Sequence, residues 1–489
     1  MTDPAPSPRF AWLCAAVGLA GSLLVAYAAP RAVADSVVRW WYMPGAPTGR
    51  GHSLVLVYVG MAVLCAAWLA MGRALPSRRA LPVIGALWML PLALAPPLFS
   101  RDIYSYLAQG LILHLGHSPY HTAPAALAGL GHQHVLDAVS PFWRHTTAPY
   151  GPLFLGLLSV VAGVAGPHLV AGVLLARVLE LVGAGLLAIY LPRLARSLGG
   201  DGRRAVWLGL LSPLVTLELI AAGHNDLLMV GLLVAGVAYA LDGRPLLGVA
   251  ICALAATVKV PALAGAAFIA VAWGREELGR GAQVRFMASA AVVALAVLGA
   301  VTLVAGVGVD WLSTSLFSTP AKVRLAITPA TGLGYTVASL LSDVGLGVSH
   351  RGLEGAFGVI AFGLTAITGA VLLYRVRVAR LVPWLGAFLV IAAAGGPAAW
   401  PWYFIWGLAL LCALRAPQRS MSVAVAVAVS VFVVKPNGIL ALPLQSAPAV
   451  MAAYALIAAM VWVHGRRRRR EHPSPAPVRE STPSALAGT

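Results

Sequence analysis

The sequence predicts an all-α, polytopic membrane protein, and three observations support this fold class. Of the 489 residues, 60% are hydrophobic and only 10% are charged, whereas a soluble domain has roughly 45–50% apolar and about 25% charged residues. Apolar runs long enough for a bilayer recur along the whole chain. Arginine-rich segments separate many of these runs, as is typical of cytoplasmic loops. Together these features exclude an ordinary soluble enzyme, a disordered chain and a disulfide-rich scaffold.

A helix needs about 20 apolar residues to cross about 30 Å of hydrocarbon. We predict fourteen crossings, six of them short. In chain order they are Phe10–Ala29, Ser53–Met71, Leu81–Leu98, His168–Leu191, Ala205–Ala222, Leu227–Leu241, Leu246–Val258, Pro261–Trp273, Phe286–Val307, Leu353–Tyr374, Leu381–Ala394, Trp402–Leu414, Met421–Val434 and Ala447–His464. Residues 1–9 then form an N-terminal tail, residues 10–464 one membrane domain, and residues 465–489 a basic, disordered C-terminal tail.

The first crossing has a second interpretation, because Ala26-Tyr27-Ala28 resembles the cleavage site of a signal peptide. Only Arg9 precedes the apolar stretch, however, and many further crossings follow, so we predict an uncleaved helix. If every arginine cluster is placed on the cytoplasmic side, the assignment of two later segments is determined. Pro152–Gly166 is then an interfacial or re-entrant helix, and Leu246–Trp273 makes two short passes that turn at Lys259-Val260-Pro261.

The formal charge of +18 would indicate nucleic-acid binding in a soluble protein. Here most of the arginines fall in loops predicted to be cytoplasmic, near anionic lipid of the inner leaflet. We therefore predict that membrane lipid, and no nucleic acid, is the partner of this charge. Both termini are expected on the cytoplasmic side of the membrane.

The largest segment predicted to face outward is the loop of residues 99–150, and long loops on a rigid scaffold often carry function. Asp102 lies at its beginning, next to the outer end of the third crossing. Two roles fit Asp102 equally well from the residues alone: an N-cap of the helix Ile103–Leu115, or a general base.

A second group of hydrogen-bonding residues, His224, Asn225 and Asp226, begins another helix at the same face. Asp226 also fits a simple negative charge at a helix N-terminus. Glu218, two turns earlier, is expected to point into the same cavity or to pair with a neighbouring helix. Lys259 interrupts an apolar segment and must therefore reach water or an anion.

Two further sets of residues allow alternatives. Lys322 and Arg324 lie on one side of an extended segment, where they could clamp a phosphate or form a solvated pair. Trp402 and Tyr403 belong to an aromatic cluster that fits an interfacial belt or a surface for sugar rings. The loop histidines lack metal-ligand spacing and no nucleotide-binding motif occurs, so no metal or cofactor is predicted.

In combination, the motifs of residues 81–403 resemble the polyprenol-phosphomannose-dependent α-1,6-mannosyltransferases of actinobacteria, which are membrane enzymes of the GT-C fold. They are Arg101-Asp102-Ile-Tyr104-Ser-Tyr106, Gln109-Gly110, Ser118-Pro119-Tyr120, Ala148-Pro149-Tyr150-Gly151-Pro152 and Gly223-His224-Asn225-Asp226. The resemblance implies polyprenyl-phosphate mannose as donor and a lipid-anchored mannan on the outer leaflet as acceptor. It also favours Asp102 as general base, although two more crossings precede this loop than in many members of the fold.

The predicted chemistry needs few groups, because a lipid phosphate leaves as a stable anion and requires no acid. One carboxylate deprotonates the acceptor and cations stabilise the phosphate. The predicted substrate-binding residues are Arg101, His224, Lys259, Lys322 and Arg324 on the phosphate side, Tyr150, Asn225, Asp226, Trp402 and Tyr403 around the sugar, and Tyr104 and Glu218 nearby.

Two alternatives to mannosyl transfer remain. The same scaffold fits transfer of arabinofuranose or another sugar from its polyprenyl phosphate. It also fits a flippase or transporter for lipid-linked sugars, which should show inverted repeats with paired broken helices. Leu246–Trp273 is one such break, and no convincing counterpart is apparent in the sequence.

Overall fold

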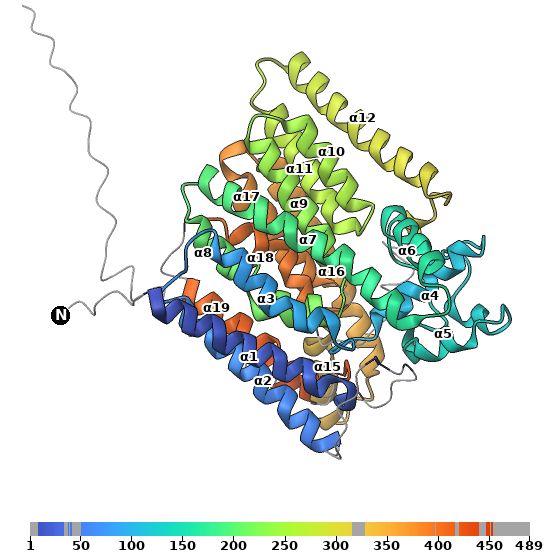
Figure 1. Ribbon diagram of the computed structural model, residues 1–489. Helices are drawn as coiled ribbons and strands as arrows, with labels where there is room; N and C mark the ends of the chain where they lie inside the picture. Colours follow the sequence, from blue (N-terminus) through green and yellow to red (C-terminus); the bar gives the residue numbers. More distant parts are fainter. Residues whose placement is uncertain are drawn as a thin grey trace, which may run out of the picture.

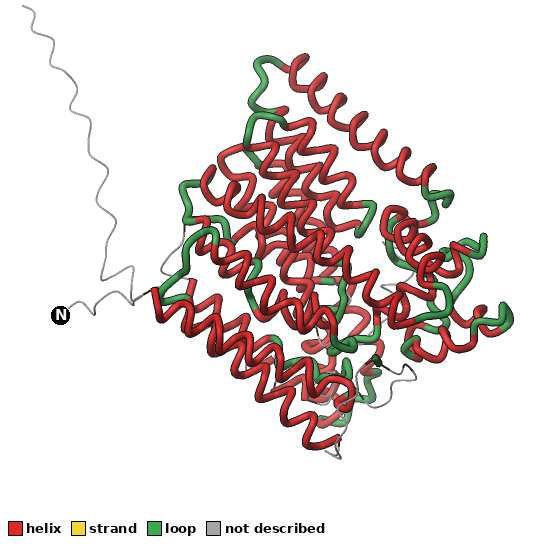
Figure 2. The backbone as a smooth tube through the Cα atoms, in the orientation of Figure 1, coloured by secondary structure: helices red, strands yellow, loops and turns green. Residues whose placement is uncertain are grey.

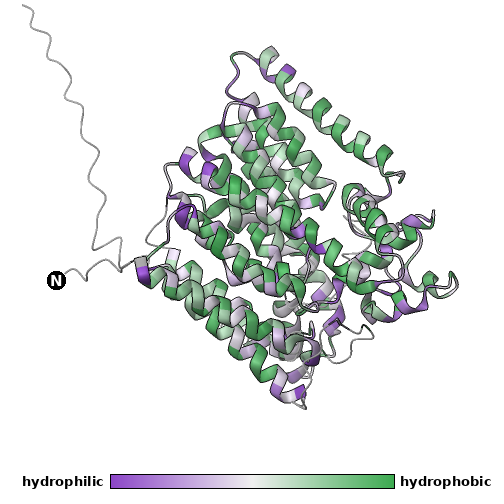
Figure 3. Ribbon diagram, viewed as in Figure 1, coloured by the Kyte–Doolittle hydropathy of each residue, from purple (hydrophilic) through white to green (hydrophobic). Residues whose placement is uncertain are grey.

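The all-α prediction is confirmed by the computed structural model, which consists of helices joined by loops (Figure 2). The structure describes residues 8–33, 38, 40–41, 50–314, 328–396, 398–415, 420–439, 446–449 and 451–452. Most helices run side by side in one bundle, and a smaller group formed by α4, α5 and α6 lies at one end of it (Figure 1). Apolar residues cover the sides of the bundle helices, and polar residues gather mainly at their ends (Figure 3).

Length and composition support six or seven membrane crossings within the described residues, a coarser result than the fourteen predicted. The long apolar helices are α1 (Pro8–Ala32), α2 (Arg50–Met71), α7 (Leu169–Ser197), α12 (Arg280–Val304), α16 (His350–Arg375) and α17 (Leu381–Gly395), which follows η6 (Val378–Arg380). Shorter apolar helices are α3 (Ala80–Leu94), α6 (Pro152–Ala165), α9 (Asp226–Leu241), α10 (Pro245–Ala256), η4 (Val260–Ala262) with α11 (Leu263–Gly274), η7 (Pro401–Phe404) with α18 (Ile405–Leu411), and α19 (Ser420–Ser430). Most of the predicted crossing Ala447–His464 lies outside the described residues.

The predicted crossing Ala205–Ala222 is not one straight helix. It consists of α8 (Gly202–Gly209) and the π-helix η3 (Leu214–Ala221), which meet at an angle of 47°. Pro213 stands at the break and cannot donate a backbone hydrogen bond to the preceding turn, which explains the bend.

The two short passes predicted for Leu246–Trp273 correspond to α10 and α11, which pack against each other. The chain turns at η4, directly after Lys259, whose backbone is extended. The position of this turn is therefore confirmed, whereas the side of the membrane that it faces stays a prediction.

The longest helix that the prediction lacks among the described residues is α15. Residues Pro329–Asp343 form α15, which packs against α16. A capping box begins it, because the Thr328 hydroxyl accepts from the Thr331 backbone N–H at 3.0 Å and the Thr331 hydroxyl accepts from the Thr328 backbone N–H at 2.9 Å. The sequence between the predicted crossings Phe286–Val307 and Leu353–Tyr374 therefore contains a further helix.

The outer-loop region folds on α4 (Asp102–His114), with η1 (Pro124–Ala128), α5 (Gln133–Ala138) and η2 (Pro141–Trp143). It has a small apolar core of its own, consisting of Ala108, Ile112, Leu127, Val135, Leu136 and Val139. The α4 helix also packs against α6, so that Pro152–Ala165 joins this group rather than standing apart from it. The loop is thus a folded unit that holds the beginning of α4 in place.

Arg177, in the middle of α7, joins the segments that lead to α4 and α9. Its buried guanidinium donates to the carbonyl oxygens of Ala93 and Ala221, at 2.7 Å each, and of Ala95. The Leu98 backbone N–H also donates to the Ala221 carbonyl, at 3.2 Å. The end of α3 and the end of η3 are consequently fixed to each other.

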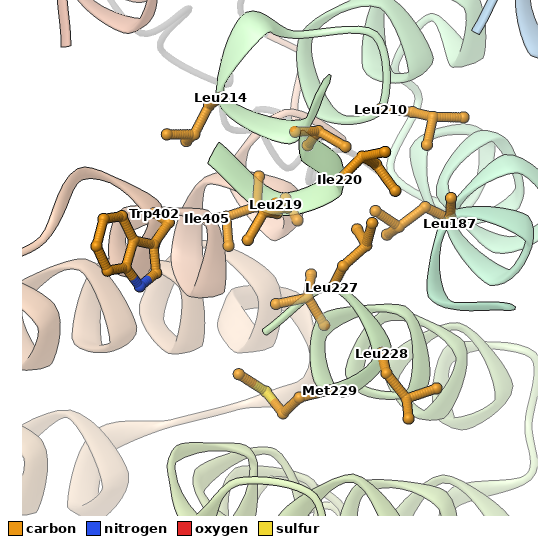
Figure 4. Close-up of a cluster of buried hydrophobic side chains, with 14 of the residues drawn as sticks. Leu187, Leu210, Leu214, Leu219, Ile220, Leu227, Leu228, Met229, Trp402 and Ile405 are labelled. Atoms are coloured by element: carbon orange, nitrogen blue, oxygen red, sulfur yellow. The ribbon is translucent and has the colours of Figure 1, made fainter. Parts of the chain in front are cut away.

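Buried apolar residues fill the space below these two ends. Leu214, Leu219 and Ile220 of η3 lie in one cluster with Leu227 of α9 and Trp402 of η7 (Figure 4). These three elements therefore pack together through one apolar cluster next to the polar residues described below.

Candidate active site

Asp102 is the first residue of α4, and its carboxylate points away from its own helix turn. Oδ1 accepts a hydrogen bond from Nε1 of Trp143 at 2.8 Å, and Oδ2 lies 3.6 Å from Nε2 of His224. The N-cap residue of α4 is Arg101, and no side chain caps the helix there. The N-cap interpretation is therefore wrong, and Asp102 is free to act on groups other than its helix.

His224 lies in the turn between η3 and α9 and is completely buried. Its Nδ1 donates to the backbone carbonyl of Glu218 at 2.5 Å, and its ring stacks on Trp402 with 4.0 Å between centroids. Trp402 in turn stacks on Trp400 at 4.7 Å. A carbonyl below and an indole beside it thus fix the orientation of the imidazole.

Gly223 makes this placement of His224 possible. Its φ of +79° is a conformation that residues with a side chain rarely adopt. A Cβ at this position would also lie 2.5 Å from Cδ1 of Ile103, the neighbour of Asp102 on α4. The turn can approach α4 closely because residue 223 has no side chain.

A second carboxylate, Asp226, lies two residues farther along. Its two oxygens accept from Nζ of Lys259 at 2.8 and 2.9 Å, and Oδ1 also accepts from Nε1 of Trp406. The ammonium lies 4.4 Å from the ring centroid of Tyr403 and 5.4 Å from that of Trp406, a cation–π arrangement. Lys259, which was predicted to reach water or an anion, is therefore paired with Asp226.

The two carboxylates have the same kinds of partner, an indole N–H and a basic side chain. They differ in access, because the side chain of Asp102 is 17% exposed and that of Asp226 only 1%. Contacts between Trp402 and Tyr403, at 5.8 Å, and between Tyr403 and Trp406, at 4.7 Å, connect the two centres. Asp102 is consequently the carboxylate of the pair that an incoming hydroxyl group can reach.

Asp102 is also charged at neutral pH. Burial disfavours its charged form, but the contact with His224 and the hydrogen bonds from Trp143 and Ser100 more than offset this effect. The pKa of Asp102 accordingly lies below the ordinary range of an aspartic acid. Its carboxylate is ionised and available as a base.

Arg101, predicted for the phosphate side, contacts the outer loop instead. Its guanidinium donates to the carbonyl oxygens of Ala138, at 2.6 and 3.1 Å, and Asp137, at 3.2 Å, at the C-terminal end of α5. Arg144 donates to the same end, where cations are favourable. Tyr104 is buried on α4, and burial raises its pKa to about 12, so that it remains a neutral phenol.

Tyr150 lies where the outer loop returns to the membrane helices. Its backbone carbonyl accepts from the Tyr120 hydroxyl at 3.0 Å, and its ring meets the Tyr106 ring edge to face at 4.9 Å. The next residue, Gly151, donates its backbone N–H to the carbonyl of Val258 at 3.1 Å. The loop therefore ends against the turn that carries Lys259.

The positions of the remaining predicted residues do not indicate a role. Glu218 and Asn225 are completely buried, and their side-chain oxygens and the Asn225 amide nitrogen have no hydrogen-bond partner among the described residues. Lys322 and Arg324 lie outside the described residues. In the part of the chain that the structure describes, no three His, Cys, Asp or Glu side chains are grouped as metal ligands would be.

Two residues at the site were not predicted from the sequence. Trp143 and Trp406 each donate an indole N–H to one of the two carboxylates. A tryptophan in a polar outer loop, as at position 143, is an unusual placement that could have drawn attention to it. Trp406 belongs to the same aromatic cluster of the sequence as Trp402 and Tyr403, but its hydrogen bond to Asp226 was not predicted.

Comparison with known proteins identifies the family of the chain. The family described as "Alpha-(1->6)-mannopyranosyltransferase, N-terminal domain" matches residues 13–275. The chain is similar to alpha-(1->6)-mannopyranosyltransferase A of Mycobacterium tuberculosis, with 35% identity covering 79% of this chain and 77% of that protein. It is also similar to a probable alpha-(1->6)-mannopyranosyltransferase of Mycolicibacterium smegmatis, with 32% identity covering 88% and 84%.

Alpha-(1->6)-mannopyranosyltransferase B of Corynebacterium glutamicum is 27% identical over 96% of this chain and 84% of its own length. No solved structure matches the chain. The family match covers more than half of the sequence, and it includes both Asp102 and the Gly223–Asp226 turn. The chain therefore belongs to the α-(1→6)-mannopyranosyltransferase family and is a membrane glycosyltransferase.

Proposed function

We propose that the protein transfers mannose from polyprenyl-phosphate mannose to a lipid-anchored mannan and forms an α-(1→6) linkage at the outer face of the plasma membrane. The observation that carries this proposal is the ionised, partly accessible carboxylate of Asp102 at the beginning of the outer-loop region. Family membership supports the transfer of mannose. The donor, the acceptor and the outward orientation extend beyond that support.

The proposed reaction is a single displacement at the anomeric carbon. Asp102 takes the proton of the acceptor hydroxyl while the acceptor oxygen forms a bond to C1 of mannose. The bond between C1 and the phosphate oxygen breaks, and its electron pair stays with the polyprenyl phosphate. Because one displacement inverts the configuration, an α-linked product requires a β-linked donor.

Asp226 is a weaker candidate for the base. Two short bonds from Lys259 and one from Trp406 occupy its oxygens, and it is almost completely buried. Such an ion pair costs several kcal/mol to disrupt. In the proposed mechanism Asp226 and Lys259 maintain the shape of the site beside Tyr403, and Asp102 performs the proton transfer.

The sugar and the phosphate are proposed to bind near these two centres. Trp402, Tyr403, Tyr150 and Asn225 are proposed to position the sugar. Cations next to a departing phosphate stabilise the charge that develops on it. Lys322 and Arg324 are proposed for that role, because the cations of the described site already contact protein groups.

The test is an assay of the purified protein with a lipid-anchored mannan acceptor and a panel of donors. The panel contains β-linked polyprenyl-phosphate mannose, its α-linked isomer, polyprenyl-phosphate arabinose and a nucleotide-linked mannose. We expect transfer from the β-linked mannose donor alone, and loss of that transfer in Asp102→Asn, which should still unfold cooperatively on heating. Preference for another donor, or full activity of Asp102→Asn, would contradict the proposal.

A further inference from the structure

The two ring nitrogens of His224 both face groups that can only accept a hydrogen bond. Nδ1 contacts the backbone carbonyl of Glu218, and Nε2 lies 3.6 Å from Oδ2 of Asp102. A carbonyl oxygen has no proton to donate, so Nδ1 must carry an N–H. An ionised carboxylate has none either, and the same requirement then applies to Nε2.

A neutral imidazole cannot satisfy both contacts. With its single proton on Nδ1, it would direct the lone pair of Nε2 toward a carboxylate oxygen in a buried place, where such a polar contact is costly. A ring with N–H groups on both nitrogens donates to the carbonyl and pairs with the carboxylate by charge, across a distance of 3.6 Å that is too long for a hydrogen bond. The stacking of His224 on Trp402 at 4.0 Å also favours a cationic ring.

The charged neighbours of His224 are consistent with this state. Asp102 of α4 faces Nε2 directly, and η3 contributes the Glu218 carbonyl together with the buried carboxyl group of the same residue. Asp226 of α9 is bound by Lys259, so these two charges offset each other. The group of η7 that packs against the imidazole ring is the indole of Trp402, which carries no charge.

We propose that His224 is an imidazolium that positions Asp102 and keeps it ionised, and that it is not a ligand of the donor phosphate. This inference rests on the proposed function and adds a positioning residue to it. His224 acts through the carboxylate: Glu218 and Trp402 hold the ring, and the ring holds Oδ2. Trp143 holds the other oxygen, so the base is fixed from two sides.

This arrangement also assists the transfer step electrostatically. The acceptor hydroxyl gives its proton to Asp102, and both protons of His224 stay in place. The Asp102–His224 pair thereby changes from net neutral to net positive, while the phosphate changes from a diester with one negative charge to a monoester with two. A positive charge that develops as the leaving group becomes more negative favours the reaction.

The experiment compares wild type with His224→Phe, which keeps a ring on Trp402 without any N–H, and with His224→Gln, which keeps a neutral N–H donor. His134→Phe, an exposed position on α5, is the matched control. For each protein, kcat and the donor KM are measured with polyprenyl-phosphate mannose across the pH range. Thermal unfolding in detergent reports whether each variant is folded.

We expect His224→Phe to lower kcat about 100-fold with the donor KM within about twofold of wild type, because the base is then no longer held in position while the donor still binds. The acidic limb of its kcat profile should move to higher pH, because the carboxylate has lost a donor. His224→Gln should recover part of kcat, and His134→Phe should match wild type. If His224→Phe does not fold, the kcat, KM and acidic limb of His224→Gln decide the question.

Two results would overturn the inference. A raised donor KM with unchanged kcat would assign His224 to the phosphate. A lowered kcat with the acidic limb of wild type would reduce its role to packing. Failure of the proposed function is distinct from both, because wild type itself would then not use polyprenyl-phosphate mannose, and the same variants would be compared on the donor that it accepts.

Discussion

Oδ2 of Asp102 and Nε2 of His224 lie 3.6 Å apart, although the two residues belong to distant parts of the sequence. The backbone fixes this distance in two ways. The Leu98 N–H binds the Ala221 carbonyl, and the Phe99 N–H binds the Pro436 carbonyl, at 3.2 and 2.8 Å. Phe99 also has a φ of 65°, which is a strained conformation for a bulky residue. Contacts with the surrounding structure must compensate for this strain.

Removal of the indole N–H at position 143 should release one oxygen of the base from its fixed position. Trp143→Phe deletes the hydrogen bond to Oδ1 of Asp102, and because that bond lowers the pKa of Asp102, the acidic limb of kcat should move to higher pH. A base that is held less precisely should lower kcat about tenfold or more. Phe142→Leu, at the exposed neighbouring position, should leave kcat and its pH profile as in wild type.

Stability should depend on pH through Asp102 in a defined direction. The pKa of Asp102 is lowered in the folded protein. The stability that its ionisation contributes is therefore present above the pKa of the unfolded chain and is lost as pH falls through the folded value. Thermal unfolding of wild type and Asp102→Asn should converge as pH falls below about 4, the ordinary pKa of an aspartic acid. A difference that grows toward acid pH would contradict this sign.

The Asp226–Lys259 pair should behave as a buried ion pair. Lys259→Met leaves a buried carboxylate unpaired and should cost about 3–5 kcal/mol of unfolding free energy, measured by chemical denaturation in detergent. Asp226→Asn combined with Lys259→Met should cost less than the sum of the two single changes. Disruption of the exposed pair Arg193–Asp242, 3.4 Å apart, should cost about 1 kcal/mol or less. Additive effects at Asp226 and Lys259 would show that the pair is not coupled.

Gly223→Ala should damage the site more than the fold. The left-handed backbone costs about 1–2 kcal/mol for a residue with a side chain, and the added Cβ would displace Ile103 and with it Asp102. Gly243→Ala is a matched control, because its φ of +81° causes the same strain with no atom within 4 Å. The two variants should unfold at similar temperatures, and only Gly223→Ala should lose most of its kcat. Equal activities of the two variants would show that the position of His224 does not depend on a glycine at residue 223.

The proposed orientation can be measured with single cysteines. In a background without the four native cysteines, His117→Cys on the predicted outer loop should react with a membrane-impermeant maleimide in intact cells. Glu276→Cys, on a predicted cytoplasmic loop, should react only after the membrane is opened. Labelling in the reverse order would place Asp102 in the cytoplasm.

The positions of most helices followed from apolar length, because the bilayer imposes a minimum run of apolar residues. The break at Pro213 was missed, since both halves of the segment are apolar enough to count as one span. The helix α15 was missed for the opposite reason: Thr331, Gly332 and Gly334 keep its sequence too polar and glycine-rich to suggest a crossing. The Thr328 capping box, with Pro329 behind it, was the available signal for its beginning.

The site was predictable only in part. The cost of a buried ammonium predicted that Lys259 reaches water or an anion, but did not select Asp226. Asp102 and His224 were both singled out from the sequence, whereas their contact depends on a turn geometry that only the fold supplies. Indole donors such as Trp143 and Trp406 have no spacing rule in the sequence, and their role emerges from packing alone.

The buried guanidinium of Arg177 has a consequence for the lipid environment. By joining the carbonyl groups of Ala93, Ala95 and Ala221, it sets the separation of the two helix ends through bonds inside the protein. Hydrocarbon thickness differs between membranes by a few ångströms, and helices commonly adjust to it by tilting. Thicker or thinner lipid should therefore change how deep this protein sits, and leave the spacing of Asp102 and His224 as it is.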